Sequence, residues 1–343
     1  MGPGPSDVPP SVLAALAKPT IGHLDPVFLR ILDETQDMLR EVFGTANTLT
    51  LPMSATGSAG METCFVNLLE PGDHALICRN GVFGGRMAEV ARRCGAEVTL
   101  VDAPWGRAVD PDDVAKAAKG RSFKVLAVVH AETSTGVLQD LRPFRAIADS
   151  CGALLLVDAV TSLAGVPVEV DELGIDAVYS GTQKCLSCPP GLSPVSFSDR
   201  AQRVISKRTT PVQSWYFDLT LIGRYFGGER VYHHTAPVNM IFALHESLRL
   251  VLEEGLEARY ARHRARADSL HTGLEALGLE LPVPESDRLP PLTLVSIPDG
   301  ADDRSIRAKL LADHGLEIGG GLGDFKAKAW RIGLMGALSL IHI

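Results

Sequence analysis

The sequence predicts an α/β protein with a large, doubly wound domain on a mainly parallel sheet, followed by a smaller α+β domain. Between about residues 60 and 182, short runs rich in Val, Leu and Ile lack strict polar alternation, as in strands buried on both faces. Helical segments separate these runs, and several end at a glycine. Strands that alternate with helices in this way form a parallel sheet covered by helices.

Each element of the large domain is defined by its apolar run or by the glycine that follows it. The predicted strands are His74–Arg79, Glu97–Asp102, Val125–His130, Ala153–Asp158 and Asp176–Ser180. The predicted helices are Met61–Leu69, Gly84–Cys94, Pro111–Lys119 and Leu141–Cys151, the last three ending at Gly95, Gly120 and Gly152. Glycine accepts the left-handed conformation without steric cost and so marks the C-terminal end of a helix.

After about residue 236 the pattern changes to that of a small α+β domain. Its predicted elements are the helices Leu244–Glu254, Glu257–Leu277 and Asp303–His314, the strands Leu292–Ile297 and Trp330–Leu334, and the glycine-rich loop Gly319–Gly323. We expect an N-terminal arm at residues 1–20, a large domain at 21–254 and a small domain at 255–343.

The two ends of the chain are unusual. A turn, Gly2–Ser6, directly follows Met1. At the other end, Leu338–Ile343 reads as the translation of a transposase mosaic end used in sequencing libraries. We therefore expect residues 338–343 to be an adapter scar, and the natural reading frame to continue past Gly336 with a further helix.

Composition narrows the classes of function. With 45% hydrophobic and 22% charged residues, the 343-residue chain can bury a large core. The net charge of −8 and a densest basic stretch (259–266) that reads as a solvated helix face argue against a nucleic-acid partner. No apolar run reaches the length of a membrane helix. Six cysteines without secretory features indicate free thiols and a cytoplasmic protein.

Two polar residues follow apolar runs at predicted strand ends, where ligands of α/β sheets bind. Asp158 ends the run 154–157, and as a costly buried carboxylate it could bind a metal, bind a ribose, cap a helix or face a protonated pyridine nitrogen. A metal is disfavoured, because no cluster of suitable ligands stands nearby. Lys184 follows the last strand in a turn of small residues. An imine-forming lysine with such an aspartate is the minimum required for pyridoxal phosphate.

The functions of two further motifs cannot be decided from their local sequence alone. The small-residue turn Thr56–Gly60 opens a helix and suits a phosphate, although a simple helix cap would look the same. The pair Cys185-x-x-Cys188 could bind zinc or act in redox chemistry, but it lacks a second ligand pair, and we interpret both as packed thiols.

Eight segments together resemble one family along nearly the whole chain. They are GPGPS (2–6), GSAGME (57–62), NGVFGGR (80–86), HAETSTGV (130–137), LLLVDAVTS (154–162), YSGTQKCLSCPPG (179–191), YHHTAPV (232–238) and RIGLMG (331–336). In this order they resemble the alanine–glyoxylate and serine–pyruvate aminotransferases, which are class V, fold-type I enzymes dependent on pyridoxal 5′-phosphate.

The resemblance implies a role for individual residues around the cofactor. Lys184 matches the lysine that bonds the cofactor as an imine and later carries protons, and Asp158 matches the partner of the pyridinium nitrogen. Phe83 takes the place of the aromatic residue that stacks on the ring. Thr133 matches the hydroxyl that bonds the phenolic oxygen.

The resemblance also implies phosphate and substrate contacts. Positions that bind the phosphate are Gly57, Ser58, Ala59 and Gln183. Tyr232 and Thr235 match residues that reach the phosphate from a partner subunit, which implies a homodimer with its active site at the interface. Arg331 matches the residue that clamps the substrate carboxylate. We assign no catalytic role to His233 or His234.

The activity implied is transamination by a ping-pong mechanism, from L-alanine or L-serine to glyoxylate or pyruvate. A cysteine-desulfurase-like lyase is the main alternative, but such enzymes typically have histidines where this chain has Phe83 and Gln183, and a cysteine in the small domain. Here every cysteine lies at or before Cys188. A non-catalytic binding protein or an NAD-dependent dehydrogenase is less consistent with the motifs. Some relatives carry a peroxisomal address at the C-terminus, so that compartment stays an alternative.

Overall fold

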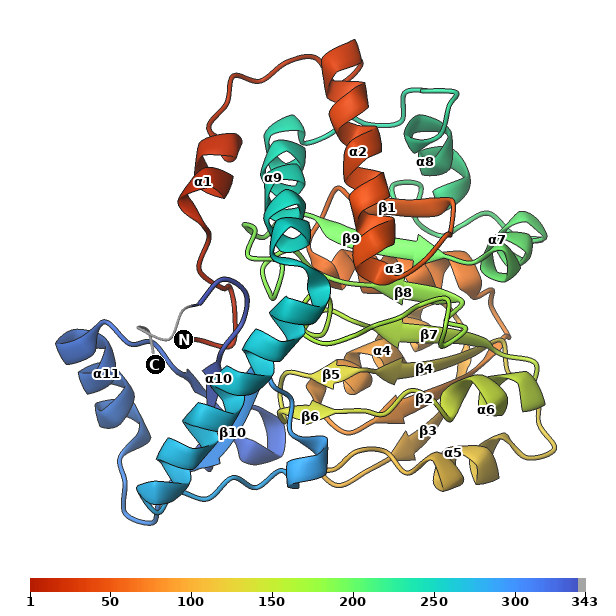
Figure 1. Cartoon of the computed structure of the whole chain (residues 1–343). Helices are drawn as coiled ribbons and strands as arrows, with labels where there is room; N and C mark the ends of the chain where they lie inside the picture. Colours follow the sequence, from red (N-terminus) through yellow and green to blue (C-terminus); the bar gives the residue numbers. More distant parts are fainter. Residues whose placement is uncertain (339–343) are drawn as a thin grey trace.

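The computed structural model describes residues 1–338, and a seven-stranded sheet forms its centre (Figure 1). The strands run in the order β1-β9-β8-β7-β4-β2-β3. Their bounds are β1 Leu49–Met53, β2 His74–Arg79, β3 Glu97–Asp102, β4 Val125–Val129, β7 Leu154–Asp158, β8 Ala177–Tyr179 and β9 Ser193–Phe197. The pairs among β3, β2, β4, β7 and β8 are parallel, whereas β9 runs antiparallel to both β8 and β1. The predicted α/β class with a mainly parallel sheet is confirmed.

Helices between the strands determine where a ligand can bind. Their bounds are α3 Gly57–Leu68, α4 Val82–Arg93, α5 Pro111–Ala118, α6 Phe144–Ser150 and α7 Asp199–Ser206. The chain leaves β2 for the edge strand β3 through α4, then returns past β2 to β4 through α5. Since parallel crossovers are right-handed, these two helices lie on opposite faces of the sheet. The reversal between β2 and β4 opens a crevice beyond the carboxyl ends of these strands.

A layer of helices brings together the N-terminal and C-terminal segments of the large domain. It contains α1 Pro10–Leu16, α2 Pro26–Phe43, α8 Leu219–Phe226 and α9 Val238–Glu254, and both α1 and α2 pack against α9. The helix α2 starts where the Asp25 side chain accepts a hydrogen bond from the Val27 N–H at 2.7 Å. It ends at Gly44, whose φ of 66° is left-handed.

A second, three-stranded sheet lies in the C-terminal part. It pairs β10 Leu292–Ser296 with β12 Ala329–Gly333, and β12 with β11 Gly319–Gly320. The helices α10 Leu256–Ala276 and α11 Asp303–His314 accompany it, and the short hairpin β5 Ala131–Glu132 with β6 Val137–Leu138 follows β4. Gly255, between α9 and α10, lies at the expected boundary, although the domain limits stay a prediction.

Several boundaries differ from those expected, each for a local reason. The helix α6 starts at Phe144 and not at Leu141, because Pro143 occupies its N-cap. The strands β1 and β9 were not predicted. Each contains a proline, Pro52 opposite Pro194, and proline argues against a strand when only the sequence is available.

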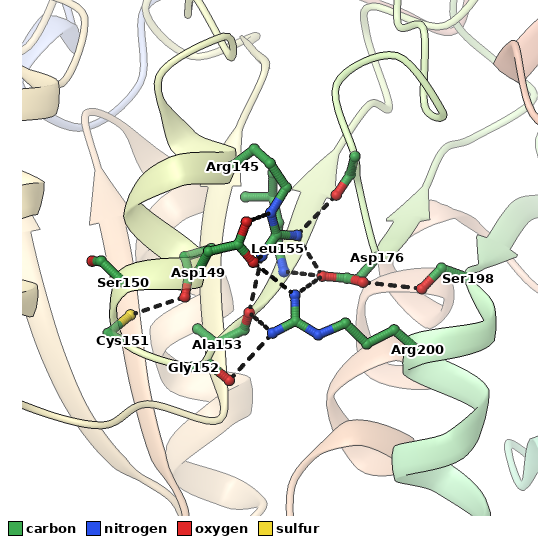
Figure 2. A network of polar contacts seen from close by, with 12 residues as sticks. Arg145, Asp149, Ser150, Cys151, Gly152, Ala153, Leu155, Asp176, Ser198 and Arg200 are labelled. Carbon is green, nitrogen blue, oxygen red and sulfur yellow. Dashed lines mark hydrogen bonds and ion pairs between the residues drawn. The ribbon is translucent and has the colours of Figure 1, made fainter.

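A buried polar network secures the amino ends of β7 and β8, away from the crevice (Figure 2). The Asp176 carboxylate accepts from the Arg145 guanidinium at 2.7 Å, the Leu155 N–H at 2.9 Å and the Ser198 hydroxyl at 3.0 Å. Arg200 donates to the Ala153 carbonyl at 2.9 Å. The network thereby ties α6 and α7 to the sheet.

Within residues 1–338, no helix combines the length and apolar character needed to cross a membrane. The adapter-scar prediction concerns residues 338–343, which, apart from Leu338, lie outside the described part of the chain.

Candidate active site

Lys184 lies in the turn after β8, with its amine enclosed and only 9% of the residue exposed. Its carbonyl accepts from the Ser6 hydroxyl at 2.6 Å and from the Ser187 N–H at 3.0 Å, which fixes the backbone. Burial lowers the pKa of the amine to about 8, with smaller effects from Cys185, Arg331 and Asp158. A buried amine of lowered pKa is available as a nucleophile near neutral pH.

The N-terminal turn forms the wall over this amine. The Lys184 Nζ donates to the Pro3 carbonyl, and the Ser6 N–H donates to the Gln183 carbonyl at 2.8 Å. Gly4 has a φ of 101°, and a Cβ added there would lie 2.6 Å from the lysine Nζ. Only glycine therefore fits at this position.

The same turn touches the C-terminal sheet, as the position of the N-terminus in Figure 1 indicates. The Gly333 N–H donates to the Met1 carbonyl at 2.8 Å. A Cβ on Gly319 would lie 2.7 Å from the Pro3 ring. Residues 1–6 thus fill the space between the lysine and the strands β11 and β12.

Asp158 ends β7 and is 2% exposed. Its Oδ2 accepts from the Tyr179 hydroxyl at 2.7 Å, and its Oδ1 accepts from the Val160 N–H at 2.9 Å. Burial raises the pKa of this carboxyl to about 7, against the effect of both donors. A cation placed beside it would favour the carboxylate form.

A buried glutamate organises the opposite side of the crevice. Glu132 accepts from the N–H groups of Phe83 at 3.0 Å and Gly84 at 3.4 Å, at the start of α4. It also accepts from the Ser134 N–H at 3.0 Å and hydroxyl at 2.6 Å. Burial raises the pKa of its carboxyl. These contacts fix the backbone of Phe83 relative to the hairpin that carries Thr133.

Thr133 and Arg331 meet in this region. The Thr133 hydroxyl lies 2.5 Å from the Thr161 hydroxyl, and its carbonyl accepts from Arg331 Nη1 at 3.3 Å. Arg331 Nε donates to the Gly320 carbonyl at 2.9 Å. Among residues 1–338, both hydrogen-bond acceptors of the guanidinium are backbone carbonyls, so its charge can still bind a carboxylate. Burial lowers the pKa of Arg331, partly offset by Glu132.

The start of α3 provides a site for an anion. Its first residues are Gly57, Ser58 and Ala59, and no side chain caps this end of the helix. A Cβ on Gly57 would lie 3.4 Å from the Ser180 carbonyl oxygen, so the turn packs close to the segment that carries the lysine. Gln183 Oε1 is buried and has no hydrogen-bond partner in the described chain. The Ala59 N–H donates to the Thr56 carbonyl at 2.8 Å, whereas the Gly57 and Ser58 N–H groups have no acceptor within residues 1–338. Free N–H groups and a helix dipole suit a phosphate.

Two of the predicted residues are not part of this cluster. Tyr232 is 59% exposed, and Thr235 is also exposed, in the segment that precedes α9. Tyr232 packs on the His23 ring, with centroids 5.5 Å apart. Both side chains are therefore accessible to another molecule.

The CxxC pair does not form a separate centre. Cys185 and Cys188 are buried free thiols, and Cys185 Sγ donates to the Thr161 carbonyl at 3.3 Å. Burial raises the pKa of Cys185 to about 11 and that of Cys188 to about 12, so neither is a reactive thiolate at neutral pH.

Sequence reasoning assigned no role to Tyr179, Glu132 or Thr161. Each lies inside a motif that was recognised, and each acts through an atom distant in sequence. The one available signal was that Glu132 follows soon after the apolar run Val125–Val129, since a carboxyl buried there needs hydrogen-bond partners.

The donor set fits pyridoxal phosphate. Lys184 supplies an amine, Asp158 a carboxylate for a ring nitrogen, and the uncapped α3 terminus an anion site. The side-chain oxygen of Gln183 is buried without a hydrogen-bond partner in the described chain, so a ligand that donates a hydrogen bond there would satisfy it. When bound, this cofactor acts as an electron sink for the α-carbon of an amino acid.

The fold and this donor set define an aminotransferase of the pyridoxal-phosphate class. Residues 3–323 match the family model "Aminotransferase class-V", and the chain belongs to that family, whose members depend on pyridoxal phosphate. The predicted family and cofactor are thus confirmed.

Three relatives show how close the similarity is. The alanine–glyoxylate aminotransferase of Rattus norvegicus is 43% identical, over 98% of this chain and 82% of its own. The crystal structure of alanine–glyoxylate aminotransferase from Nostoc sp. has 47% identity and a TM-score of 0.97, covering 98% and 89% of the two chains. The ureidoglycine–glyoxylate aminotransferase of Bacillus subtilis has 43% identity and a TM-score of 0.96, covering 98% and 87%.

Proposed function

We propose that this aminotransferase moves an amino group from a small L-amino acid, alanine or serine, to glyoxylate or pyruvate by a ping-pong mechanism. The observation that carries the proposal is the convergence of Lys184, Asp158 and Arg331 on one crevice. Glyoxylate occurs in the names of all three relatives, whereas the donor named is alanine in two and ureidoglycine in the third. The acceptor is therefore the better supported half of the reaction.

Each residue of the crevice has one task in this proposal. Lys184 holds the cofactor and carries the proton at the substrate α-carbon, which its lowered pKa permits near neutral pH. Asp158 keeps the ring nitrogen protonated, and Phe83 covers the ring face. Thr133 bonds the phenolic oxygen. The turn at Gly57, with Ser58, Ala59 and Gln183, binds the phosphate.

Substrate size follows from the N-terminal wall. Pro3 and Gly4 lie against the Lys184 amine, and the side chain of a substrate must fit beside them. Arg331 binds the substrate carboxylate through its guanidinium fork, which orients the Cα–H bond relative to the ring. A small side chain suits this enclosed space better than a large one.

We also propose a homodimer, in which Tyr232 and Thr235 reach the partner's phosphate site. Their exposure supports this arrangement, as does the exposure of neighbouring apolar side chains: Leu24 at 48%, Val27 at 47%, Trp215 at 62% and Val231 at 37%. Such side chains are costly on a monomer surface and favour an interface. Sedimentation velocity tests the state, and a monomer would contradict it.

The cytoplasm is the compartment we propose, because Cys64, Cys78, Cys94, Cys151, Cys185 and Cys188 are all free thiols. For the reaction, the test is a panel of donors and acceptors with keto-acid product measured. We expect alanine or serine with glyoxylate to turn over fastest. Desulfuration of cysteine without any transfer to glyoxylate or pyruvate would instead support a lyase.

A further inference from the structure

A chain of hydrogen bonds runs through the adjacent histidines that precede α9. His234 Nε2 lies 2.7 Å from Ser54 Oγ, and the Nδ1 atoms of the two rings are 2.8 Å apart. His233 Nε2 lies 3.2 Å from the Trp215 carbonyl. The His233 ring, 7% exposed, also stacks on the Trp215 indole, with centroids 4.2 Å apart and 16° between the planes.

The acceptor at one end sets the direction of the chain. A carbonyl can only accept, so His233 carries its proton on Nε2 and offers Nδ1 as an acceptor. His234 therefore donates from Nδ1. Burial, with His233 and His23, lowers the pKa of His234 to about 4, so its Nε2 accepts from the Ser54 hydroxyl at neutral pH. Each polar atom of the pair thus has one defined partner.

Ser54 connects this chain to the anion site. It follows β1 and precedes α3, whose first residue is Gly57. Its hydroxyl binds His234, and its carbonyl accepts from the Tyr216 hydroxyl at 3.0 Å. The hydroxyl and the carbonyl of Ser54 are therefore both hydrogen-bonded to side chains of the segment 215–235.

The two histidines also belong to a segment with exposed residues. The histidines lie between Tyr232 and Thr235, the two exposed residues expected to reach a partner subunit. These hydrogen bonds therefore link Ser54, which precedes α3, to the histidines of the 232–235 segment and to the Trp215 carbonyl.

We propose that His233 and His234 are positioning residues that hold two phosphate-binding features in register. One is the start of α3, which serves the subunit's own site, and the other is the Tyr232–Thr235 segment, which serves the site of the partner. This inference rests on the proposed function, because it requires a dimer that binds pyridoxal phosphate through both features. The proposal gives neither histidine a contact with the cofactor.

The test compares the affinity of apoprotein for pyridoxal phosphate and for pyridoxal, which lacks the phosphate. Ser54→Ala removes the donor to His234, and the loss of one hydrogen bond predicts about threefold to tenfold weaker binding of pyridoxal phosphate. Pyridoxal affinity should not change. Ser54→Thr keeps the hydroxyl and should restore the wild-type affinity.

Two further variants sharpen the result. His234→Asn retains a donor toward His233 but cannot reach Ser54. It should show the same selective loss of affinity for pyridoxal phosphate, so the test does not depend on the folding of Ser54→Ala. His245→Gln is the control. His245 lies on α9 and pairs with Glu34 at 2.9 Å, and it takes no part in the hydrogen bonds between Ser54, His234, His233 and Trp215. Its affinities should equal those of the wild type.

The outcomes separate this inference from the proposed function. If Ser54→Ala loses affinity for pyridoxal phosphate and for pyridoxal equally, or loses no affinity for pyridoxal phosphate, the positioning role is overturned while the proposed function stands. Wild-type protein that binds no pyridoxal phosphate overturns the proposed function, and the inference with it. Selective loss of the phosphorylated ligand, restored by threonine, supports the inference.

Discussion

Removing the hydroxyl of Tyr179 probes the electrostatics of Asp158 directly. Tyr179 is fully buried and donates to Asp158 Oδ2 at 2.7 Å, and Val160 N–H is the donor to the other oxygen. Tyr179→Phe takes away one of these two donors and changes little else in shape. The pKa of Asp158, about 7 through burial, should therefore rise further.

The size of the effect follows from the type of hydrogen bond. A bond to a charged group contributes about 1.5–3 kcal/mol. One pKa unit corresponds to about 1.4 kcal/mol, so the carboxyl pKa should rise by about one to two units. Because the carboxylate is the form that binds a pyridinium, cofactor affinity is lost as pH falls through this pKa. In the variant that loss should begin at a correspondingly higher pH.

Cofactor titration of apoprotein across a pH series measures this shift. Tyr260→Phe is the matched control. It also removes one tyrosine hydroxyl, but Tyr260 lies on α10 and its hydroxyl is not a donor to Asp158. At neutral pH we expect Tyr179→Phe to bind the cofactor about fivefold to fiftyfold more weakly, because a rise of one to two units from a pKa of about 7 leaves that much less carboxylate. A folded Tyr179→Phe protein with the wild-type pH dependence would refute the reasoning.

Three other predictions follow from the same geometry. Gly4→Ala combines a left-handed φ with a clash at the Lys184 amine, so we expect about 1–3 kcal/mol weaker covalent cofactor binding in equilibrium titrations, and wild-type affinity would contradict this. The rate of covalent cofactor uptake should rise with pH through about 8, since the neutral amine is the nucleophile, and a flat stopped-flow profile would exclude it. Asp176→Ala leaves the Arg145 guanidinium with only the exposed Asp149 carboxylate, and it removes the acceptor of the buried Leu155 N–H. Urea denaturation should therefore show about 1–3 kcal/mol lower free energy of unfolding, whereas a change below about 1 kcal/mol would argue that solvent replaces the network.

Much of the fold was predictable because the central strands are buried on both faces. The runs Ala75–Cys78 of β2 and Leu154–Val157 of β7 are apolar throughout, and a glycine follows the C-cap of each helix between these two strands. The edge strand β1 and its neighbour β9 lacked this signal, since Pro52 and Pro194 occur inside them. Their pairing depends on a contact between distant segments, which no local pattern encodes.

The candidate site was predictable to a similar extent. Asp158 and Lys184 each follow an apolar run, so the carboxyl ends of parallel strands place them together. Tyr179 and Glu132 gain their importance from hydrogen bonds to Asp158 and to the start of α4, which only the three-dimensional arrangement defines. The tasks of Tyr232 and Thr235 depend on a second subunit and stay predictions.

The central claim is that Lys184 is the residue that bonds pyridoxal phosphate. Borohydride reduction of the cofactor-loaded enzyme, followed by peptide mass spectrometry, tests it most directly. We predict that the reduced cofactor is found on the peptide that contains Lys184, and that Lys184→Ala abolishes both the label and transamination. A label on another lysine, or an active Lys184→Ala enzyme, would contradict the account.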